Sequence, residues 1–226
     1  MADDFVSFIW PSTCASCNER LFKHEDTICT NCLIKLPRTH FHLWKENDFH
    51  RLFWGKVNIE YATAFFFFLK ESKYRKLIHK LKYQHMPEIG VILGRELGYE
   101  IAQSVFSEID LIVPVPLHPK KEFIRGYNQS DKIAIGLGQG MGKPIDCKTL
   151  IRNTHTASQT RKNRYERWEN VNSIFTVTNP EIFKNKHILI VDDVVTTGST
   201  LESCIVEVLN AGAAKVSLAA LGIAKE

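Results

Sequence analysis

The stretch HILIVDDVVTTGSTLESCIVEVLNAG, residues 187–212, decides the fold. Residues 188–191 form a short apolar run with helical sequence on both sides, which predicts a central strand of a parallel sheet covered on both faces. The run stops at Asp192 and Asp193. Two adjacent carboxylates at the end of a buried strand are costly to ionise unless they face hydroxyls, a cation or water, because desolvation and mutual repulsion oppose the charge. We therefore expect a cleft beside them.

A small, hydroxyl-rich loop follows the two acids. Its residues are Thr196, Thr197, Gly198, Ser199 and Thr200. Apolar residues then recur at helical spacing over residues 201–209, and Gly212 is expected to end the helix. A loop of this composition at a helix N-terminus presents backbone N–H groups, hydroxyls and the positive end of the helix dipole to an anion, most naturally a phosphate.

These residues resemble the 5-phosphoribosyl 1-diphosphate signature of the type I phosphoribosyltransferases: four apolar residues, two acids, two variable residues, then Thr-Thr-Gly-Ser-Thr. In that family the acids hold the ribose 2′- and 3′-hydroxyls, and the loop binds the 5′-phosphate. The resemblance implies that Asp192 and Asp193 are ribose ligands and that residues 196–200 bind the phosphate. A strand, an acidic turn and a helix cap with no ligand is the alternative interpretation.

Length and composition allow one good core and a small second module. The chain has 226 residues, 44% of them hydrophobic, and a net charge of +4 that permits a polyanionic partner without requiring one. The N-terminus opens with Asp3 and Asp4, and Pro11 breaks its apolar segment, so we expect no signal peptide. The longest mainly apolar run, residues 61–69, is too short to span a bilayer as a helix. We expect a cytoplasmic protein without membrane insertion.

Four cysteines near the N-terminus follow the pattern C-x2-C-x11-C-x2-C. They are Cys14, Cys17, Cys29 and Cys32. Two such pairs at this separation predict four thiolates around one structural Zn²⁺, with no open position for catalysis. Disulfide, redox-active or unliganded cysteines are the alternatives. An irregular connector rich in aromatic residues follows, so we expect a zinc module with its connector over residues 1–58 and the main domain over residues 59–226.

The main domain is expected to begin with a buried strand in residues 61–69 and a helix in residues 74–82 whose outer faces are basic. That basic surface fits a solvated helix face and a polyanion-binding face equally well. Residues 111–113 predict another buried strand, which Pro114 ends. In the phosphoribosyltransferase layout the loop after this strand surrounds and binds the diphosphate. The residues that this layout assigns here are Pro116, Leu117, Lys120 and Arg125, with Lys121 as a further cation and Asn128 as the cap of the next helix.

Three later features complete the prediction. GLGQGMG, residues 136–142, follows a helix rather than a strand, so we interpret it as a helix end and turn and not as a dinucleotide site. Cys147, in a strand expected over residues 145–151, and Cys204 are predicted to be core thiols. The polar residues 152–172 are a candidate substrate-facing segment, and residues 175–177 and 216–224 are expected to complete the sheet.

The order of four pieces is similar to that of the ComF family of competence-associated proteins, the ComFC/GntX-like group. The pieces are the four-cysteine module, VPVPLHPKKEFIRGYNQ, RNTHTASQTRKNR and VDDVVTTGSTL. The resemblance implies an α/β fold, with a zinc module on a parallel-sheet type I phosphoribosyltransferase domain. It also implies a Mg²⁺-dependent ligand, a role of some members in DNA uptake with single-stranded DNA, and a competence helicase as partner. Purine-specific relatives often carry an acid where this chain has Thr196, so the acceptor is not assigned.

Two functions follow from these residues. As an enzyme, the protein would bind 5-phosphoribosyl 1-diphosphate with Mg²⁺, and Asp192, Asp193 and Arg125 would act at the transferred ribose and its leaving group. As a non-catalytic accessory protein, it would bind single-stranded DNA through its basic helix and the Arg-rich segment, with Tyr165 and Trp168 available for stacking.

Overall fold

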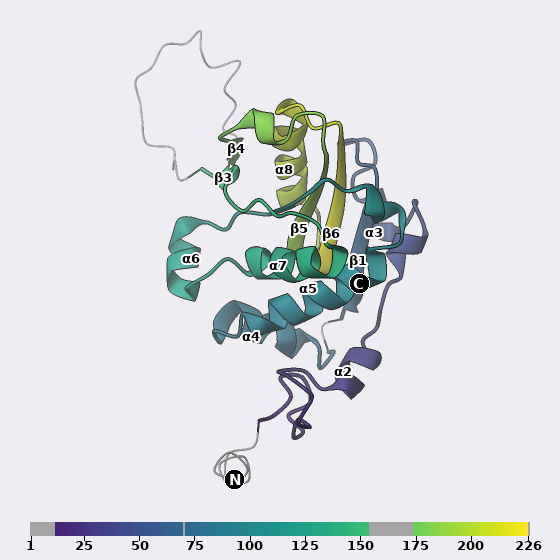
Figure 1. The fold of residues 1–226 in the computed structure, drawn as a ribbon, viewed down its shortest axis with the longest axis vertical. Helices are drawn as coiled ribbons and strands as arrows, with labels where there is room; N and C mark the ends of the chain where they lie inside the picture. Colours follow the sequence, from purple (N-terminus) through teal and green to yellow (C-terminus); the bar gives the residue numbers. More distant parts are fainter. Residues whose placement is uncertain (1–11, 70, 154–173, 226) are drawn as a thin grey trace.

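The computed structural model describes residues 12–69, 71–153 and 174–225. Within these residues a four-stranded sheet has the order β1-β6-β5-β2, and every neighbouring pair is parallel (Figure 1). The strands are β1 (Ala62–Phe68), β2 (Leu111–Pro114), β5 (His187–Val195) and β6 (Lys215–Ala224). The predicted α/β class and its parallel sheet are confirmed, and β5 is central, as expected for a strand whose residues 188–191 are completely buried.

Helices cover both faces of this sheet. One face carries α4 (Arg75–Tyr83), α5 (Glu88–Ile101) and α7 (Gln129–Met141). The other face carries α8 (Ser199–Asn210). Buried residues of the described chain form two hydrophobic clusters, one on each face, which is the arrangement that a parallel sheet requires.

Glycines allow α5 and α7 to pack with their backbones in contact. A Cβ atom on Gly136 would lie 2.0 Å from the carbonyl oxygen of Val91, and one on Gly94 would lie 2.3 Å from that of Ile133. The stretch 136–142 is therefore not a dinucleotide site, as predicted, but the turn begins later than expected. Helix α7 continues to Met141, and only Gly142, with φ +65°, forms the left-handed C-cap.

The N-terminal region packs against the main domain on both sides. It contains α2 (Thr30–Ile34), η1 (Phe41–Leu43) and α3 (Asp48–Arg51). Cys14, Cys29 and Cys32 belong to the α4 and α5 cluster, whereas Phe49 and Phe53 belong to the α8 cluster. The chain before η1 also bonds to the edge of β1, where Thr39 N–H donates to Phe65 O over 3.2 Å and Phe67 N–H to Pro37 O over 2.9 Å. A domain boundary at residues 58/59 remains a prediction.

The segments between β2 and β5 differ from the sequence-based expectation. Strand β4 (Phe175–Val177) does not join the main sheet but pairs antiparallel with β3 (Leu150–Arg152) in a separate two-stranded sheet. The strand predicted over 145–151 is wrong for most of its length, because the Asp146 carboxylate accepts hydrogen bonds from Lys148 N and Thr149 N and forms a turn.

That turn leaves Cys147 exposed rather than in the core, whereas Cys204 is buried in α8 as predicted. Most of the predicted polar segment 152–172 lies outside the described residues, including Tyr165 and Trp168. The remaining short elements are α6 (Pro119–Arg125), η2 (Val105–Glu108) and η3 (Pro180–Ile182). No helix in the described ranges is both long and apolar enough to cross a membrane.

Candidate functional site

The two acids lie on the part of β5 that extends beyond the end of its neighbouring strand β2. Strand β5 does not stop at Asp192, as the sequence predicted, but continues beside β6 to Val195. Strand β2 is shorter, since its last pair with β5 joins Pro114 to Val191 and Val115 N–H makes one more bond to Val191 O over 2.8 Å. The carboxyl end of a parallel strand next to a shorter neighbour is a common ligand position in α/β folds.

Asp192 is held by two donors. Its Oδ1 accepts hydrogen bonds from Ser130 Oγ at 3.2 Å and from Asp193 N–H at 2.8 Å. Burial raises the pKa of the Asp192 carboxyl to about 7, and the neighbouring charge of Asp193 acts in the same direction. Near neutral pH, a ligand that donates hydrogen bonds to this carboxylate would favour its ionised form.

Asp193 keeps one oxygen for a ligand. Its Oδ1 lies 2.8 Å from Nζ of Lys82 at the C-terminal end of α4. Its Oδ2 is buried and has no hydrogen-bond partner among the described residues. A buried carboxylate oxygen without a donor is unfavourable, so this atom indicates a ligand that supplies one. Sequence reasoning assigned Lys82 to the outer surface of a basic helix and did not place it at the acids.

A cavity of about 180 Å³ opens beside the two acids. Four cations and two carboxylates line it, which suits a ligand that combines phosphate groups with hydroxyls. The lining residues are Lys82, Val115, Pro116, Leu117, Lys121, Arg125, Gln129, Ser130, Arg152, Asp192, Asp193 and Thr200.

Pro116, Leu117 and Arg125, three of the residues that the resemblance assigned to the diphosphate, line the cavity together with the two acids, and their role stays a prediction. Lys120 does not line this cavity, and Lys121 lines it instead. The segment predicted to be a loop is helix α6, which begins with Pro119 and has His118 as its N-cap. Successive residues of a helix point about 100° apart, so only one of two adjacent lysines can face the cavity.

Arg125 is positioned by two neighbours at the end of α6. Its Nη1 donates to Gln129 Oε1 over 2.6 Å, and its guanidinium carbon lies 5.1 Å from the ring centre of Tyr83. The predicted cap of α7 is confirmed, because the Asn128 side chain accepts a bond from Ser130 N–H at 3.0 Å. That cap holds Ser130 beside Asp192.

The hydroxyl-rich loop adjoins the cavity and begins α8. A smaller hollow of about 50 Å³ lies within it and shares Asp192 and Thr200 with the cavity beside the acids. Gly198 is the N-cap of α8, with φ +79°, and a Cβ atom there would lie 3.0 Å from Cζ of Phe53. The loop thus needs glycine for its conformation and for its contact with the aromatic connector. The side chains of Thr196, Thr197, Ser199 and Thr200 are exposed, as a phosphate-binding loop requires.

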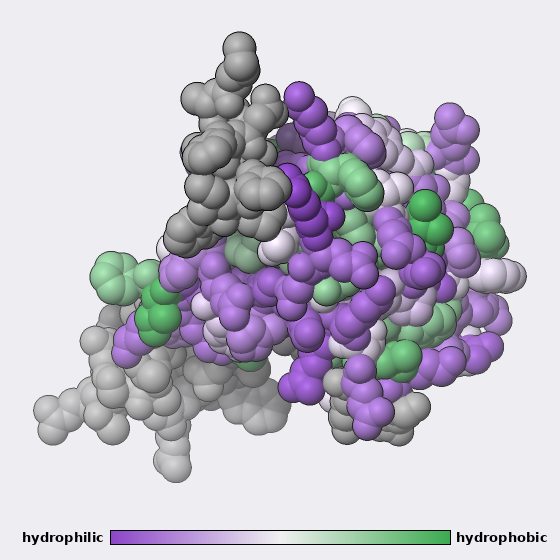
Figure 2. Space-filling view, turned by 90° about the horizontal axis from the view of Figure 1, so that it is seen from below, coloured by the Kyte–Doolittle hydropathy of each residue, from purple (hydrophilic) through white to green (hydrophobic). Residues whose placement is uncertain are grey.

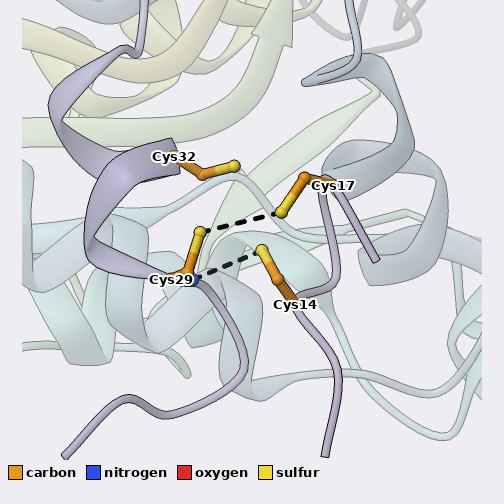
Figure 3. A group of neighbouring side chains, drawn as sticks. All are labelled: Cys14, Cys17, Cys29 and Cys32. Atoms are coloured by element: carbon orange, nitrogen blue, oxygen red, sulfur yellow. Dashed lines mark hydrogen bonds between the residues drawn. The ribbon is translucent and has the colours of Figure 1, made fainter. Parts of the chain in front are cut away.

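The four N-terminal cysteines converge at a separate position (Figure 3). Their sulfur atoms all lie within 4.8 Å of one another, and Sγ of Cys17 is 3.7 Å from Sγ of Cys29. A tetrahedral zinc site with Zn–S bonds of about 2.3 Å has sulfur atoms about 3.8 Å apart, so this geometry fits zinc, whereas a disulfide needs about 2.05 Å. Burial opposes ionisation of Cys14, but backbone N–H groups, led by that of Cys29, outweigh it and lower the Cys14 pKa to about 7.

Comparisons with known proteins identify the family of this chain. The family described as "Phosphoribosyl transferase domain" matches residues 149–224. The DNA utilization protein YhgH of Escherichia coli is 32% identical over 216 residues, which cover 91% of this chain and 87% of the relative. The chain belongs to the ComF family. A second ComF-type relative, Competence protein F of Haemophilus influenzae, is 30% identical over 130 residues, 55% of this chain and 57% of that protein.

A solved structure, the glutamine phosphoribosylpyrophosphate amidotransferase from B. subtilis in complex with ADP and GMP, is 21% identical with a TM-score of 0.45. It covers 62% of this chain and 30% of that chain, a similarity too weak to support an argument. This ComF protein therefore has a phosphoribosyltransferase-type α/β fold with a four-cysteine cluster at its N-terminus, as the resemblance implied.

Proposed function

We propose that this ComF protein binds 5-phosphoribosyl 1-diphosphate together with Mg²⁺ and is a phosphoribosyltransferase. The observation that carries the proposal is the buried Oδ2 of Asp193, which has no hydrogen-bond partner among the described residues and belongs to a cavity that is also lined by four cations. A ribose hydroxyl supplies the missing donor, and a second hydroxyl fits Asp192, whose pKa of about 7 falls when a donor arrives. The hydroxyl-rich loop at the α8 N-terminus then receives the 5′-phosphate.

The cations of the cavity fit the leaving group. Departure of the diphosphate from ribose C1′ leaves an oxocarbenium-like ribose and an anion, so catalysis needs positive charge at the diphosphate and acids beneath the ring. Lys121 and Arg125, both from α6, line the cavity together with the two acids, and Arg125 donates a hydrogen bond to Gln129. Mg²⁺ would partly neutralise the diphosphate, and Asp192 and Asp193 are the only carboxylates that line the cavity among the described residues.

Calorimetry with 5-phosphoribosyl 1-diphosphate, with and without Mg²⁺, tests the proposal. Changing Asp192→Asn and Asp193→Asn together should weaken binding at least about 100-fold, because two charge-assisted hydrogen bonds are lost. Lys121→Ala should weaken it about tenfold, and Lys120→Ala, the matched control on the same helix, less than about twofold. Unchanged binding in the double Asn variant would refute the proposal.

A second candidate function is single-stranded DNA binding without turnover, which the names of the relatives support. The structure offers a surface for it between the cysteine module and α4, where a hollow of about 490 Å³ has cations along α4 and one acid, Glu71. The basic lining residues are Arg75, Lys76, His79 and Lys80. This surface does not include Asp192 or Asp193, so the two functions do not exclude each other.

DNA binding has its own test. Affinity for an oligonucleotide should fall steeply with salt, because phosphate contacts release counterions, and Lys76→Ala with Lys80→Ala should reduce both the affinity and the salt slope. The variant Asp192→Asn with Asp193→Asn should retain DNA affinity. An oligonucleotide affinity that does not change with salt concentration would contradict the electrostatic interpretation.

A further inference from the structure

The cysteine cluster receives a hydrogen bond from outside its own segment. Cys14 accepts hydrogen bonds from nearby backbone, from Ser16 N–H at 3.4 Å and from Cys29 N–H at 3.3 Å. Cys32 accepts one from the main domain, because Nζ of Lys73 lies 3.6 Å from its sulfur atom. In Figure 1 the cysteine segment, in dark purple, lies below α4, the helix that begins two residues after Lys73.

Tyr74 follows Lys73 and is the N-cap of α4. Its side chain is buried, and its hydroxyl has no hydrogen-bond partner among the described residues. Burial raises the pKa of Tyr74, and the charged groups that act on its phenol are Lys73, Cys32 and Cys29. A buried hydroxyl without a partner is unfavourable, so an ionised cysteine beside it would supply the acceptor that it lacks.

The beginning of α4 is basic where a helix is stabilised by acids. Its first turn has no acidic residue, and Lys73, Arg75 and Lys76 are all cationic. Cations at this end oppose the positive end of the helix dipole. Four thiolates around one Zn²⁺ carry a net charge of about −2, so an occupied cysteine site offsets both the dipole and these cations.

The cysteines and α4 also share apolar contacts. One hydrophobic cluster includes Cys14, Cys29, Cys32, Tyr74, Leu77, Ile78 and Leu81. Figure 2 views the molecule from the end where the cysteine segment and α4 lie in Figure 1, and this face is mainly hydrophilic. The apolar side of the cysteine segment therefore packs inward on α4. The other end of α4 carries Lys82, whose Nζ lies 2.8 Å from Oδ1 of Asp193.

We propose that Lys73 and Tyr74 are the outer shell of the cysteine site, and that metal binding by the four cysteines holds α4 in place through them. Lys73 donates to the Cys32 thiolate and offsets the negative charge of the site, and the Tyr74 hydroxyl donates to a thiolate. The cysteine site thus controls how α4 presents Lys82 to Asp193. The proposal needs no ligand at the acids, so it stands or falls independently of the proposed function.

Competition with a chromophoric chelator measures the zinc affinity of the full chain. Lys73→Gln and Tyr74→Phe should each weaken it about tenfold, because outer-shell partners orient metal ligands and increase their basicity. Lys73→Arg keeps the charge and should stay within about threefold of the wild type. The controls Lys76→Gln and Tyr99→Phe remove the same groups from exposed positions on α4 and α5, and should change the affinity less than about twofold. Equal effects in a variant and its control would overturn the proposal.

Cobalt provides a spectroscopic signature that a merely structural role would not move. In Co²⁺-substituted protein the thiolate-to-metal absorption bands depend on the hydrogen bonds that the thiolates accept. Lys73→Gln and Tyr74→Phe should shift these bands, and Lys76→Gln should leave them unchanged. A wild-type protein that binds neither zinc nor cobalt, or spectra of both variants that match the wild type, would overturn the outer shell.

Amide hydrogen exchange of the zinc-loaded full chain tests the link to α4. Lys73→Gln should speed exchange of the amides of residues 77–82 at least about threefold, because the start of the helix is less firmly held. The amides of α8, which belong to the hydrophobic cluster on the other face of the sheet, are the internal control and should not change. Unchanged exchange in α4, or equal increases in α4 and α8, would overturn the role of the cysteine site in holding this helix.

Discussion

The cysteine cluster and the cavity at the acids differ in how their residues come together. The cluster draws all its ligands from residues 14–32, whereas the cavity combines α4, α6, α7 and β5 with residues from Lys82 to Thr200. Spacing within a short segment can specify a tetrahedral set of thiolates, because few backbone conformations satisfy all four. A cavity built from distant elements depends on how helices pack on the sheet. The two regions therefore differ in how far sequence alone can describe them.

The largest effect should come from breaking the local site. Cys14→Ser with Cys29→Ser should lower zinc content from about one equivalent to less than about 0.1, and it should destabilise the protein by several kcal/mol, because metal binding and folding are coupled. Both cysteines are buried in the cluster that includes α4, so the loss should also lower the thermal midpoint. Metal analysis and calorimetry on freshly purified protein measure both.

Cys147→Ser is the control for that experiment, because this thiol is exposed and outside the cluster. It should leave zinc content and thermal midpoint unchanged. Wild-type protein with less than about half an equivalent of zinc would contradict the expected closed four-thiolate site.

A smaller effect should appear at the distant site when pH changes. The pKa of Asp192 is about 7 in the folded protein and 3.8 in a reference chain, so between these values the folded state holds a proton that the unfolded state has lost. The free energy of unfolding should therefore decrease as pH rises from about 4 to 7. Asp192→Asn cannot titrate, so its stability relative to the wild type should rise over this window by roughly 1–3 kcal/mol.

Urea unfolding at pH 5 and pH 8 measures that difference. Asp131→Asn provides an internal comparison, because burial and then the charge of Glu122 raise the pKa of Asp131 to about 6. The pH range over which the stability of Asp131→Asn rises relative to the wild type should end about one pH unit lower than the range for Asp192→Asn. A relative stability of Asp192→Asn that does not change with pH would show that this carboxyl is ordinarily solvated.

The smallest effect, a difference of about 1 kcal/mol between two glycine variants, tests the contact between the aromatic connector and the hydroxyl-rich loop. Gly198→Ala should cost about 2 kcal/mol, because alanine adopts positive φ at a penalty and its Cβ would crowd Phe53. Gly142→Ala is the matched control, since Gly142 also has positive φ but nothing lies within 4 Å of its Cβ position. It should cost only about 1 kcal/mol. Equal costs in denaturant unfolding would show that Phe53 does not constrain the loop.

The sequence alone determined the features that depend on neighbouring residues. The apolar run before Asp192, the glycine-centred loop and the paired cysteines predicted a buried parallel strand, a helix N-terminus and a cluster of four cysteines, and the structure has all three. Each depends on backbone periodicity or on short spacing, which neighbouring residues control. The same reasoning failed at residues 145–151, because the Asp146 side chain competes with strand pairing in a way that hydrophobicity does not reveal.

Only the tertiary structure decided which cations reach the acids. Lys82 belongs to a basic helix in which its neighbours Lys76 and Lys80 line a different hollow, and nothing in the sequence distinguishes it from them. It meets Asp193 because α4 ends beside the carboxyl end of β5, and Lys121 replaces Lys120 because α6 is a helix rather than a loop. These choices depend on how helices pack against the sheet, a long-range property that the order of residues along the chain does not show directly.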